Sequence, residues 1–180
     1  DVVVHRMTTK ATSELTSKEA ASIRTLLDGA FDGRFTDSLW NQALGGIHFF
    51  VVEDGLPISH AAVVGRTLVV GDRDVEAGYV EAVGTGEGFR RQGLARKVMS
   101  SAASHIVECY EMGALHSVLP TFYVHLGWEK WRGLTYVRSE AGLVRTPEDD
   151  GCVHVWRFLA SSDLNLDDSI SCPWRPGYVW

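Results

Sequence analysis

Residues 78–95 read GYVEAVGTGEGFRRQGLA, and the fold class of this chain can be predicted starting from them. Ala77–Thr85 is rich in aromatic and β-branched residues and predicts a strand. A glycine-rich turn follows, and Arg-x-x-Gly-x-Ala at residues 90–95 opens a segment, Leu94–Met112, in which apolar residues recur at helical spacing. We expect Gly113 to end this helix. The order predicted here is strand, tight turn and long helix.

The turn into this helix is suited to binding a phosphate group. The first turn of a helix has unpaired backbone N–H groups and the positive end of the helix dipole. Gly93 allows close approach of an anion, Ala95 keeps the helix wall low, and Arg90 and Arg91 add positive charge. The turn is neither a Walker loop, since no GKS or GKT follows, nor a GxGxxG dinucleotide motif. A basic helix cap with no ligand is the competing interpretation, which the preceding strand and the long helix disfavour.

The elements on either side predict one mixed domain, residues 1–180. Val2–Met7 alternates as a strand does, and Thr16 with Glu19 forms a capping box at the start of a helix that we expect Gly33 to end. Further strands, helices and turns are expected at Asp37–Leu44 (helix), Ile47–Glu53, Ile58–Val70, Ala114–Val118, Thr121–His125 (helical turn), Trp128–Val137 and Cys152–Leu159. This order predicts an α/β fold of the α+β type, with a mixed, mostly antiparallel central sheet flanked by helices.

Composition narrows the classes of function. The chain has 180 residues, a formal net charge of -6 and a pI of about 5.6, which argues against nucleic acid or anionic membrane as a partner and favours cationic ligands. The three cysteines have no CxxC spacing and are expected to be free thiols in a reducing compartment, hence a cytoplasmic location. Neither a secretion signal nor an apolar run of membrane-spanning length is visible. The seven histidines do not fall at metal-ligand spacings, so we expect no metal site.

Arg90-x-x-Gly93-x-Ala95 resembles the acetyl-CoA signature of the GNAT superfamily. The resemblance implies a GNAT fold and acetyl-CoA as the cofactor. It implies that the pyrophosphate is held by the backbone of one continuous turn. The residues of this turn are Arg90, Arg91, Gln92, Gly93, Leu94 and Ala95. It also implies that the pantetheine arm pairs, as a strand would, with the backbone of Val83, Gly84 and Thr85.

Two residues suit the transfer of an acetyl group to an amine, a reaction in which the amine must lose a proton and the departing thiolate must gain one. Glu81 is an acidic residue inside an otherwise apolar strand, and we expect it to be the general base, acting through a water molecule. Otherwise it is a solvent-facing position on a half-exposed strand. Tyr123 precedes Gly127-Trp128 in a segment that resembles the GNAT segment carrying the general acid, and a phenol suits that role. Otherwise it is a core tyrosine.

The resemblance extends to the aminoglycoside 2'-N-acetyltransferases. It is carried, in order along the chain, by Leu44–His48, Gly78–Glu81, Gly113–Leu115, Gly127–Trp128, Arg145–Gly151 and Trp174–Trp180. It implies a homodimer that acetylates the 2'-amine of an aminoglycoside antibiotic. It also implies site residues: Glu81 and Ala82 on the substrate side, Tyr123 as the acid, and Asp149 and the terminal carboxylate of Trp180 as amine contacts.

The residues themselves support part of this assignment. Glu148-Asp149-Asp150 is a compact acidic cluster suited to ammonium groups, unless it is simply a solvated loop. The tail Cys172–Trp180 is too apolar for a free end, so we expect it to pack against the domain.

The chain departs from the family where acidic residues would grip the antibiotic. Arg34, Leu39 and Tyr178 stand at those positions, and His116 stands where the family has a serine. Fewer carboxylates and one added guanidinium suit a less polycationic substrate, and kasugamycin, which carries its own carboxylate, fits that description. Gentamicin- or tobramycin-like substrates remain the competing expectation.

Two further functions stay open at the level of sequence. One is a GNAT enzyme for a different amine, such as a polyamine, an amino acid or a protein N-terminus. The tail and the segment Arg145–Gly151 argue against it. The second is a non-catalytic coenzyme A-binding module, against which the presence of both Glu81 and Tyr123 argues.

Overall fold

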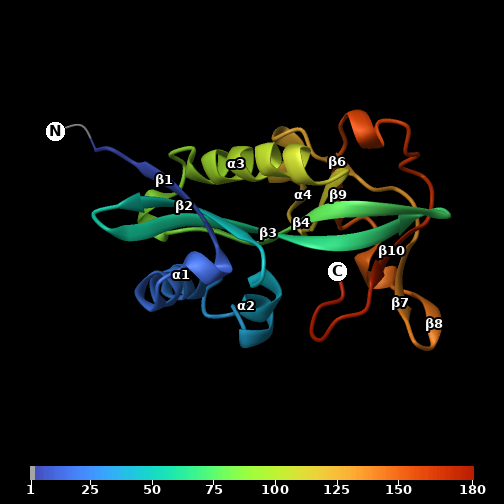
Figure 1. Cartoon of the computed structure of the whole chain (residues 1–180), viewed down its shortest axis with the longest axis horizontal. Coiled ribbons are helices and arrows are strands. Elements are labelled where there is room, and N and C mark those ends of the chain that lie inside the picture. The colour runs from blue at the N-terminus through green and yellow to red at the C-terminus, as the bar shows by residue number, and fades with distance from the viewer. Residues whose placement is uncertain (1–2) are drawn as a thin grey trace. The chain divides into compact units, whose positions relative to one another are not determined.

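The computed structural model describes residues 3–180, so the start of the strand expected at Val2–Met7 lies outside the described residues. The chain forms two compact units (Figure 1). Unit 1 comprises residues up to Val64 and Val80–Ser104, and unit 2 comprises Gly65–Tyr79 and His105–Trp180. The expectation of a single domain over residues 1–180 stays a prediction.

Two long strands contribute to both units. They are β3, Leu56–Val70, and β4, Arg73–Thr85. Each strand therefore has one segment whose neighbours lie in unit 1 and another whose neighbours lie in unit 2. The sequence pattern placed their far ends correctly but started both strands too late.

Unit 1 is a small sheet with helices on both sides (Figure 1). β1 pairs antiparallel with β2, and β2 pairs antiparallel with β3. In Figure 1, α1 and α2 lie on one side of these strands and α3 on the other. The elements are β1 (Arg6–Ala11), the 3₁₀ turn η1 (Thr12–Glu14), α1 (Ser17–Ala30), α2 (Asp37–Ala43), β2 (Ile47–Glu53), η2 (Glu87–Phe89) and α3 (Leu94–Cys109), whose last residues belong to unit 2.

Helix α1 begins as the sequence predicts. The Thr16 hydroxyl accepts from the Glu19 amide at 3.0 Å, and the Glu19 carboxylate accepts from the Thr16 amide at 3.0 Å, which confirms the capping box. The helix ends at Ala30, earlier than expected. Gly33 lies beyond it with φ +74°, and its amide donates to the Asp28 carbonyl at 2.8 Å, so it closes the turn after the helix.

Helix α3 also begins as predicted, at Leu94, but it ends at Cys109. The prediction that Gly113 stops this helix was wrong, because Gly113 lies inside β5, Met112–His116. A Cβ atom on Gly113 would lie 3.0 Å from side-chain atoms of both Trp128 and Trp156. The glycine at this position therefore makes room for two tryptophans.

Unit 2 is built from short strands on either side of its segments of β3 and β4. On one side β5 runs parallel to β4, and β9 pairs antiparallel with both β5 and β6. On the other side β10 pairs antiparallel with β3 and parallel with β7, which forms an antiparallel hairpin with β8. Most pairs are antiparallel, which confirms the predicted fold class. The elements are β5, α4 (Pro120–His125), β6 (Glu129–Lys130), β7 (Thr135–Ser139), β8 (Gly142–Arg145), η3 (Pro147–Asp149), β9 (Val153–Trp156), η4 (Leu159–Ser161) and β10 (Ile170–Pro173).

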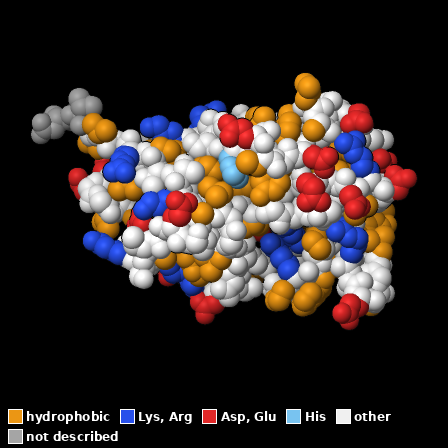
Figure 2. Space-filling view, in the orientation of Figure 1, with side chains coloured by type: hydrophobic (Ala, Val, Ile, Leu, Met, Phe, Trp, Pro, Cys, Tyr) orange, Lys and Arg blue, Asp and Glu red, His pale blue; other side chains and the backbone are white. Residues whose placement is uncertain are grey.

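Charged side chains of both signs cover the face seen in Figure 2, and acidic ones gather at its right-hand end. Within residues 3–180, no helix has the length and apolar character needed to cross a membrane.

Candidate active site

The predicted coenzyme-binding turn lies in unit 1 and is open to solvent. Residues 90–93 are exposed, and Arg91 and Gly93 have left-handed backbone, with φ +63° and +76°. The Lys97 amide donates to the Gly93 carbonyl at 3.1 Å, so Gly93 caps α3. The first amides of the helix therefore have no partner within it and face the exposed turn. Apart from Gly93 itself and its two chain neighbours, no described atom lies within 4 Å of a Cβ built on Gly93, so an anion has room to approach.

The predicted pantetheine-binding segment, Val83–Thr85, forms the end of β4. The described pairing of β4 with β5 covers Ala77–Tyr79 and does not extend to this segment. One edge of it therefore lacks a strand partner among the described residues, which leaves its amide and carbonyl groups available to a peptide-like arm. The opposite edge is fixed to β3, because Gly86 donates to the Ile58 carbonyl at 2.9 Å and Thr85 bonds to Ser59 at 2.9 Å.

Glu81 and Ala82 lie in the unit 1 segment of β4, and both are half-buried. Ala82 has φ +53°, a left-handed backbone that is unusual for a non-glycine residue inside a strand. Holding a residue there costs about 1–3 kcal/mol, so the surrounding structure must enforce it. The kink at Ala82 turns the strand between the predicted base and the predicted coenzyme edge.

Two buried histidines reach this kink, and neither was singled out from the sequence. His60 bonds through Nδ1 to the Ala82 carbonyl at 2.8 Å and through Nε2 to His48 at 2.9 Å. Burial lowers the pKa of His48 to about 4 and that of His60 to about 3, so both rings are neutral at neutral pH. The sequence pointed to these two histidines only in that each of two neighbouring predicted strands contains one.

Tyr123 lies in α4 of unit 2, next to the partly exposed ring of Phe122, whose centroid is 4.9 Å from its own. Burial raises the pKa of the Tyr123 phenol to about 12. The phenol therefore keeps its proton throughout the physiological range, as a proton donor must.

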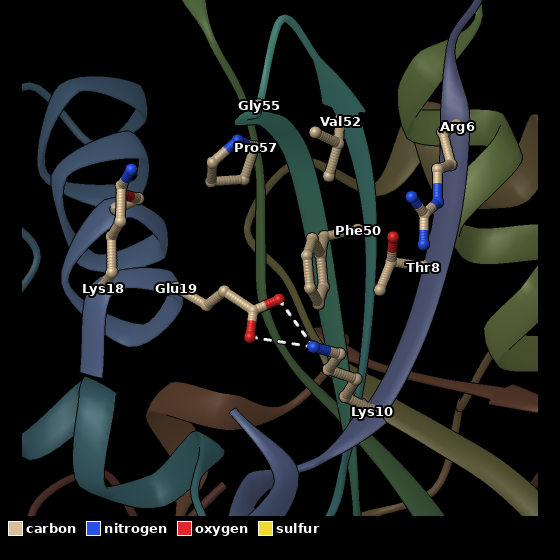
Figure 3. A pocket seen from close by; sticks show the side chains of 10 residues that line it. Arg6, Thr8, Lys10, Lys18, Glu19, Phe50, Val52, Gly55 and Pro57 are labelled. Carbon is tan, nitrogen blue, oxygen red and sulfur yellow. Dashed lines mark hydrogen bonds and ion pairs between the residues drawn. The ribbon is translucent and has the colours of Figure 1, made fainter. Parts of the chain in front are cut away.

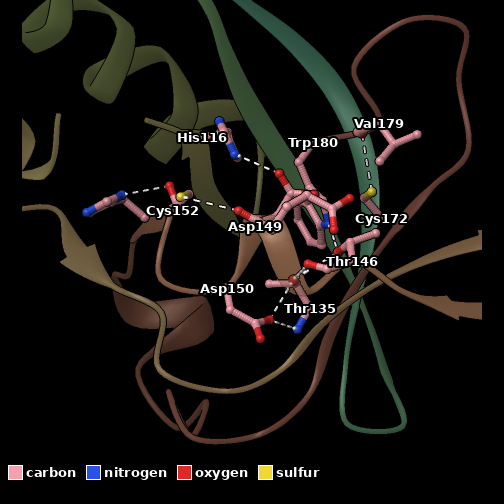
Figure 4. A network of polar contacts seen from close by, with 11 residues as sticks. His116, Thr135, Thr146, Asp149, Asp150, Cys152, Cys172, Val179 and Trp180 are labelled. Atoms are coloured by element: carbon pink, nitrogen blue, oxygen red, sulfur yellow. Dashed lines mark hydrogen bonds and ion pairs between the residues drawn. The ribbon is translucent and has the colours of Figure 1, made fainter. Parts of the chain in front are cut away.

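His116 and Asp149 form a close pair in unit 2 (Figure 4). Nε2 of His116 lies 2.9 Å from a carboxylate oxygen of Asp149, and both side chains are partly buried. Burial raises the pKa of the Asp149 carboxyl, and the nearby His116 opposes that rise. The two predicted substrate-binding residues are therefore brought together by β5 and by the 3₁₀ turn η3.

Asp150 is adjacent in sequence but is already engaged. Its carboxylate accepts from Arg145 at 2.9 and 2.8 Å and from the amide and hydroxyl of Thr135, each at 2.9 Å. The Arg145 guanidinium holds the pKa of this carboxyl well below its usual range. The ammonium contact expected of Asp150 stays a prediction, and this ion pair counts against it.

The tail packs against unit 2, as expected from its apolar sequence. The Trp180 side chain is buried, and its indole N–H donates to the Thr146 hydroxyl at 3.1 Å (Figure 4). The Val179 carbonyl accepts from Arg66 at 2.6 Å and from the Cys172 thiol at 3.2 Å. Thr146 also links Trp180 to the acidic turn, because the Asp149 amide donates to the Thr146 carbonyl at 2.9 Å.

The positions that depart from the family differ in exposure. The Arg34 side chain in unit 1 is 83% exposed, and its guanidinium lies 3.8 Å from the Asp32 carboxylate. Leu39 packs against the core cluster of α1. Tyr178 in unit 2 is exposed. A guanidinium at residue 34 is thus accessible to a ligand.

Unit 1 also has a pocket of about 220 Å³ between α1, β1 and the β2–β3 hairpin, and none of the predicted site residues lines it (Figure 3). Lys10 and Glu19 form an ion pair across it, with both carboxylate oxygens 2.9 Å from the ammonium nitrogen. The lining residues are Arg6, Thr8, Lys10, Lys18, Glu19, Ser22, Phe50, Val52, Gly55 and Pro57. No three metal-binding side chains among residues 3–180 are placed to hold an ion.

Comparison with known proteins shows the family of this chain. The family described as "Acetyltransferase (GNAT) domain" matches residues 11–131. The aminoglycoside 2'-N-acetyltransferase of Mycolicibacterium fortuitum is 38% identical over 182 residues, which span 99% of this chain and 93% of that protein.

Solved structures share the fold at low sequence identity. The GNAT N-acetyltransferase YhbS of Escherichia coli, crystallised with CoA, has a TM-score of 0.70 at 16% identity, covering 96% of this chain and 91% of that one. A GCN5-related N-acetyltransferase from Kribbella flavida has a TM-score of 0.60 at 17% identity and covers 73% of this chain, which spans about a third (34%) of its length. The chain belongs to the GNAT acetyltransferases and, within them, to the family of the aminoglycoside 2'-N-acetyltransferases.

Proposed function

We propose that this chain transfers the acetyl group of acetyl-CoA to the 2'-amine of an aminoglycoside antibiotic and thereby confers resistance. The observation that supports it most is the 38% identity to an aminoglycoside 2'-N-acetyltransferase over 99% of the chain. The enzyme class follows from the family: the chain is an acetyl-CoA-dependent N-acetyltransferase. The open amides at the start of α3 and the unpaired edge of Val83–Thr85 fit the pyrophosphate and the pantetheine arm of that donor.

In the proposed mechanism, bound acetyl-CoA supplies a thioester carbonyl that is open to attack by an amine. A carboxylate oxygen of Glu81 accepts the proton that the amine loses, through a water molecule. The Tyr123 hydroxyl holds the proton that the leaving thiolate requires, since burial keeps its pKa near 12. The Asp149 carboxylate attracts an ammonium group of the substrate, and Trp180, whose indole N–H donates to Thr146 of the same turn, helps to hold that turn in place.

The substrate proposal rests on Arg34, which is exposed where the family has an acidic residue. A guanidinium repels a polycationic antibiotic and attracts a carboxylate, so we propose kasugamycin as a better acceptor than tobramycin. We further propose that the protein is a homodimer, as the family resemblance implies, and that it resides in the cytoplasm, where its free cysteines stay reduced.

A thiol-release assay with acetyl-CoA and a panel of antibiotics tests the activity. We expect release with 2'-amino antibiotics and none with an aminoglycoside that carries a 2'-hydroxyl instead. Within the panel, kasugamycin should have the higher kcat/KM, and Arg34→Glu should shift the preference about tenfold toward tobramycin. A strong tobramycin preference in the unmodified chain ends the kasugamycin proposal. Equal release with the 2'-hydroxyl compound ends the assignment to the 2'-amine.

A further inference from the structure

The kink at Ala82 is held from one side by a single line of hydrogen bonds that begins at the chain's first 3₁₀ turn. The Gly45 amide donates to the Thr12 hydroxyl at 2.9 Å, and Thr12 Oγ1 lies 2.7 Å from Nε2 of His48. Nδ1 of His48 lies 2.9 Å from Nε2 of His60, and Nδ1 of His60 lies 2.8 Å from the Ala82 carbonyl oxygen. All five residues belong to unit 1.

The last acceptor fixes the direction of every bond in this line. A carbonyl oxygen only accepts, so Nδ1 of His60 carries the hydrogen, and a neutral His60 then accepts at Nε2. His48 must therefore donate from Nδ1 and accept at Nε2. The Thr12 hydroxyl is then the donor to His48 at 2.7 Å, in preference to the Gly46 carbonyl, which lies farther away at 3.4 Å. Thr12 in turn accepts from the Gly45 amide. Both histidines are thus Nδ1–H tautomers, and a second proton on His60, at Nε2, would remove the acceptor of the His48 Nδ1–H group.

Burial keeps the line intact. The side chains of His48 and His60 are both fully buried, with the Trp40 ring 6.1 Å from that of His48. The antiparallel register pairs His48 with Ala62 and Phe50 with His60, which sets the two histidines diagonally on one face of the β2–β3 ladder.

The line of hydrogen bonds ends at Ala82, and the proposed function depends on the conformation of this residue. Ala82 has φ +53°, and its side chain packs on the cluster of Ile23, Leu27 and Phe50. Glu81 precedes it and the open edge Val83–Thr85 follows it, so a rotation of the Ala82 peptide moves both. If the hydrogen bond from His60 is removed, we expect Ala82 to relax from this φ toward ordinary extended backbone.

We propose that the His48–His60 pair is a positioning device for the transfer reaction: by holding the Ala82 carbonyl it sets the orientation of Glu81 and of the coenzyme-binding edge. The inference rests on the proposed function for the roles of Glu81 and Val83–Thr85. In this role the two buried histidines act through the Ala82 carbonyl and not by direct contact with the substrate.

A matched pair of variants tests the proposal. Asparagine at residue 60 places its amide where Nδ1 stands and donates to the Ala82 carbonyl, whereas glutamine places its amide where Nε2 stands and does not. Both remove the same ring and leave a polar amide in the same buried site, so both should lower the melting temperature similarly. We expect His60→Gln to lose about 10- to 100-fold in kcat/KM for acetyl transfer and to bind coenzyme A more weakly, while His60→Asn keeps most of both. Equal losses in the two variants would overturn the proposal.

Two readouts do not need an acceptor substrate, so they separate this inference from the proposed function. Imidazole ¹⁵N spectra should show Nδ1–H tautomers for His48 and His60, still neutral at about pH 5. Amide exchange of Val83, Gly84 and Thr85 should accelerate in His60→Gln and not in His60→Asn. Nε2–H tautomers, or exchange that is equal in the two variants, would refute the positioning role even if antibiotic acetylation is confirmed. If no antibiotic is acetylated but these readouts are as expected, the proposed function fails and the control of the Ala82 kink stands.

Discussion

At the scale of single residues, the chemistry of Tyr123 depends on where α4 places it. An ordinary phenol already keeps its proton at neutral pH, and burial raises the pKa of this one to about 12. Such a group is a poor base and a stable proton donor. The sequence suggested the role of proton donor only through the resemblance, and that role stays a prediction: the raised pKa keeps the proton on the hydroxyl but also makes the phenol a weaker acid.

Replacing Tyr123 with Phe should lower kcat about 100-fold, because the hydroxyl proton is removed while the ring is kept. Coenzyme A affinity, measured by calorimetry, should stay within about twofold of the original value, since the proposed coenzyme site is the α3 turn. Phe122→Leu is a matched control, because Phe122 is the neighbouring, partly exposed ring of the same helix. A kcat that is unchanged in Tyr123→Phe would remove this residue from the mechanism.

At the scale of elements, close packing decides which glycines tolerate a side chain. A Cβ on Gly46, the residue before β2, would overlap the carbonyl oxygen of Val63 in β3. The backbone of Val63 can move away from such a side chain only if β2 and β3, the strands that carry His48 and His60, separate. Gly29, near the end of α1, has no described atom within 4 Å of the same built position.

Gly46→Ala should therefore lower the free energy of unfolding by about 3 kcal/mol or more, as overpacking against backbone does. Gly29→Ala should raise it by about 0.5–1 kcal/mol, because alanine restricts the unfolded chain and favours helix. Urea denaturation of the two variants beside the parent chain measures both. A Gly46→Ala variant as stable as the parent would show that β2 and β3 are less closely apposed at this point.

At the scale of the whole molecule, the buried histidines tie stability to pH. The pKa of His48 falls to about 4 and that of His60 to about 3 on folding, from an ordinary value near 6.5. Below about pH 6.5 the unfolded chain therefore binds protons that the folded chain excludes, so stability falls as pH falls. The stability that comes from keeping both rings neutral is fully present above about pH 6.5. It is lost as pH falls toward the pKa values that the histidines have in the folded chain. Burial also lowers the pKa of His105 and His154, which act in the same direction.

We expect the free energy of unfolding to decrease by about 5 kcal/mol between about pH 7 and pH 4.5 through this pair, at up to about 1.4 kcal/mol per pH unit for each histidine. Urea titrations at several pH values measure the slope. The double variant His48→Gln/His60→Gln should show a smaller slope, and the remaining slope includes His105, His154 and carboxyls whose pKa is lowered on folding, such as Glu19. A slope that is the same in the double variant would place the pH sensitivity elsewhere.

Features that depend on residues close together in the sequence could be predicted, and features that depend on residues far apart could not. The capping box of Thr16 and Glu19 and the start of α3 at Leu94 depend on residues within one helical turn, and both were predicted. The strands β8 and β10 were not predicted, because each has only four residues and exists by pairing with partners elsewhere in the chain. Asp150 shows the same limit at the site: its ammonium contact stays a prediction, and its bonds to Arg145 and Thr135 could be seen only in the folded chain.

The sequence by itself determined the strand–turn–helix unit at residues 78–95, the mixed and mostly antiparallel fold class, and the chemistry of the turn, since glycine, arginine and a helix start act over short range. Tertiary structure decided the neutral histidine pair, the left-handed backbone at Ala82, the close approach of His116 and Asp149, and the anchoring of Trp180. These features arise from strand register and from burial, which join residues distant in sequence and change their pKa values. Neither strand register nor burial can be determined from a local pattern of residues.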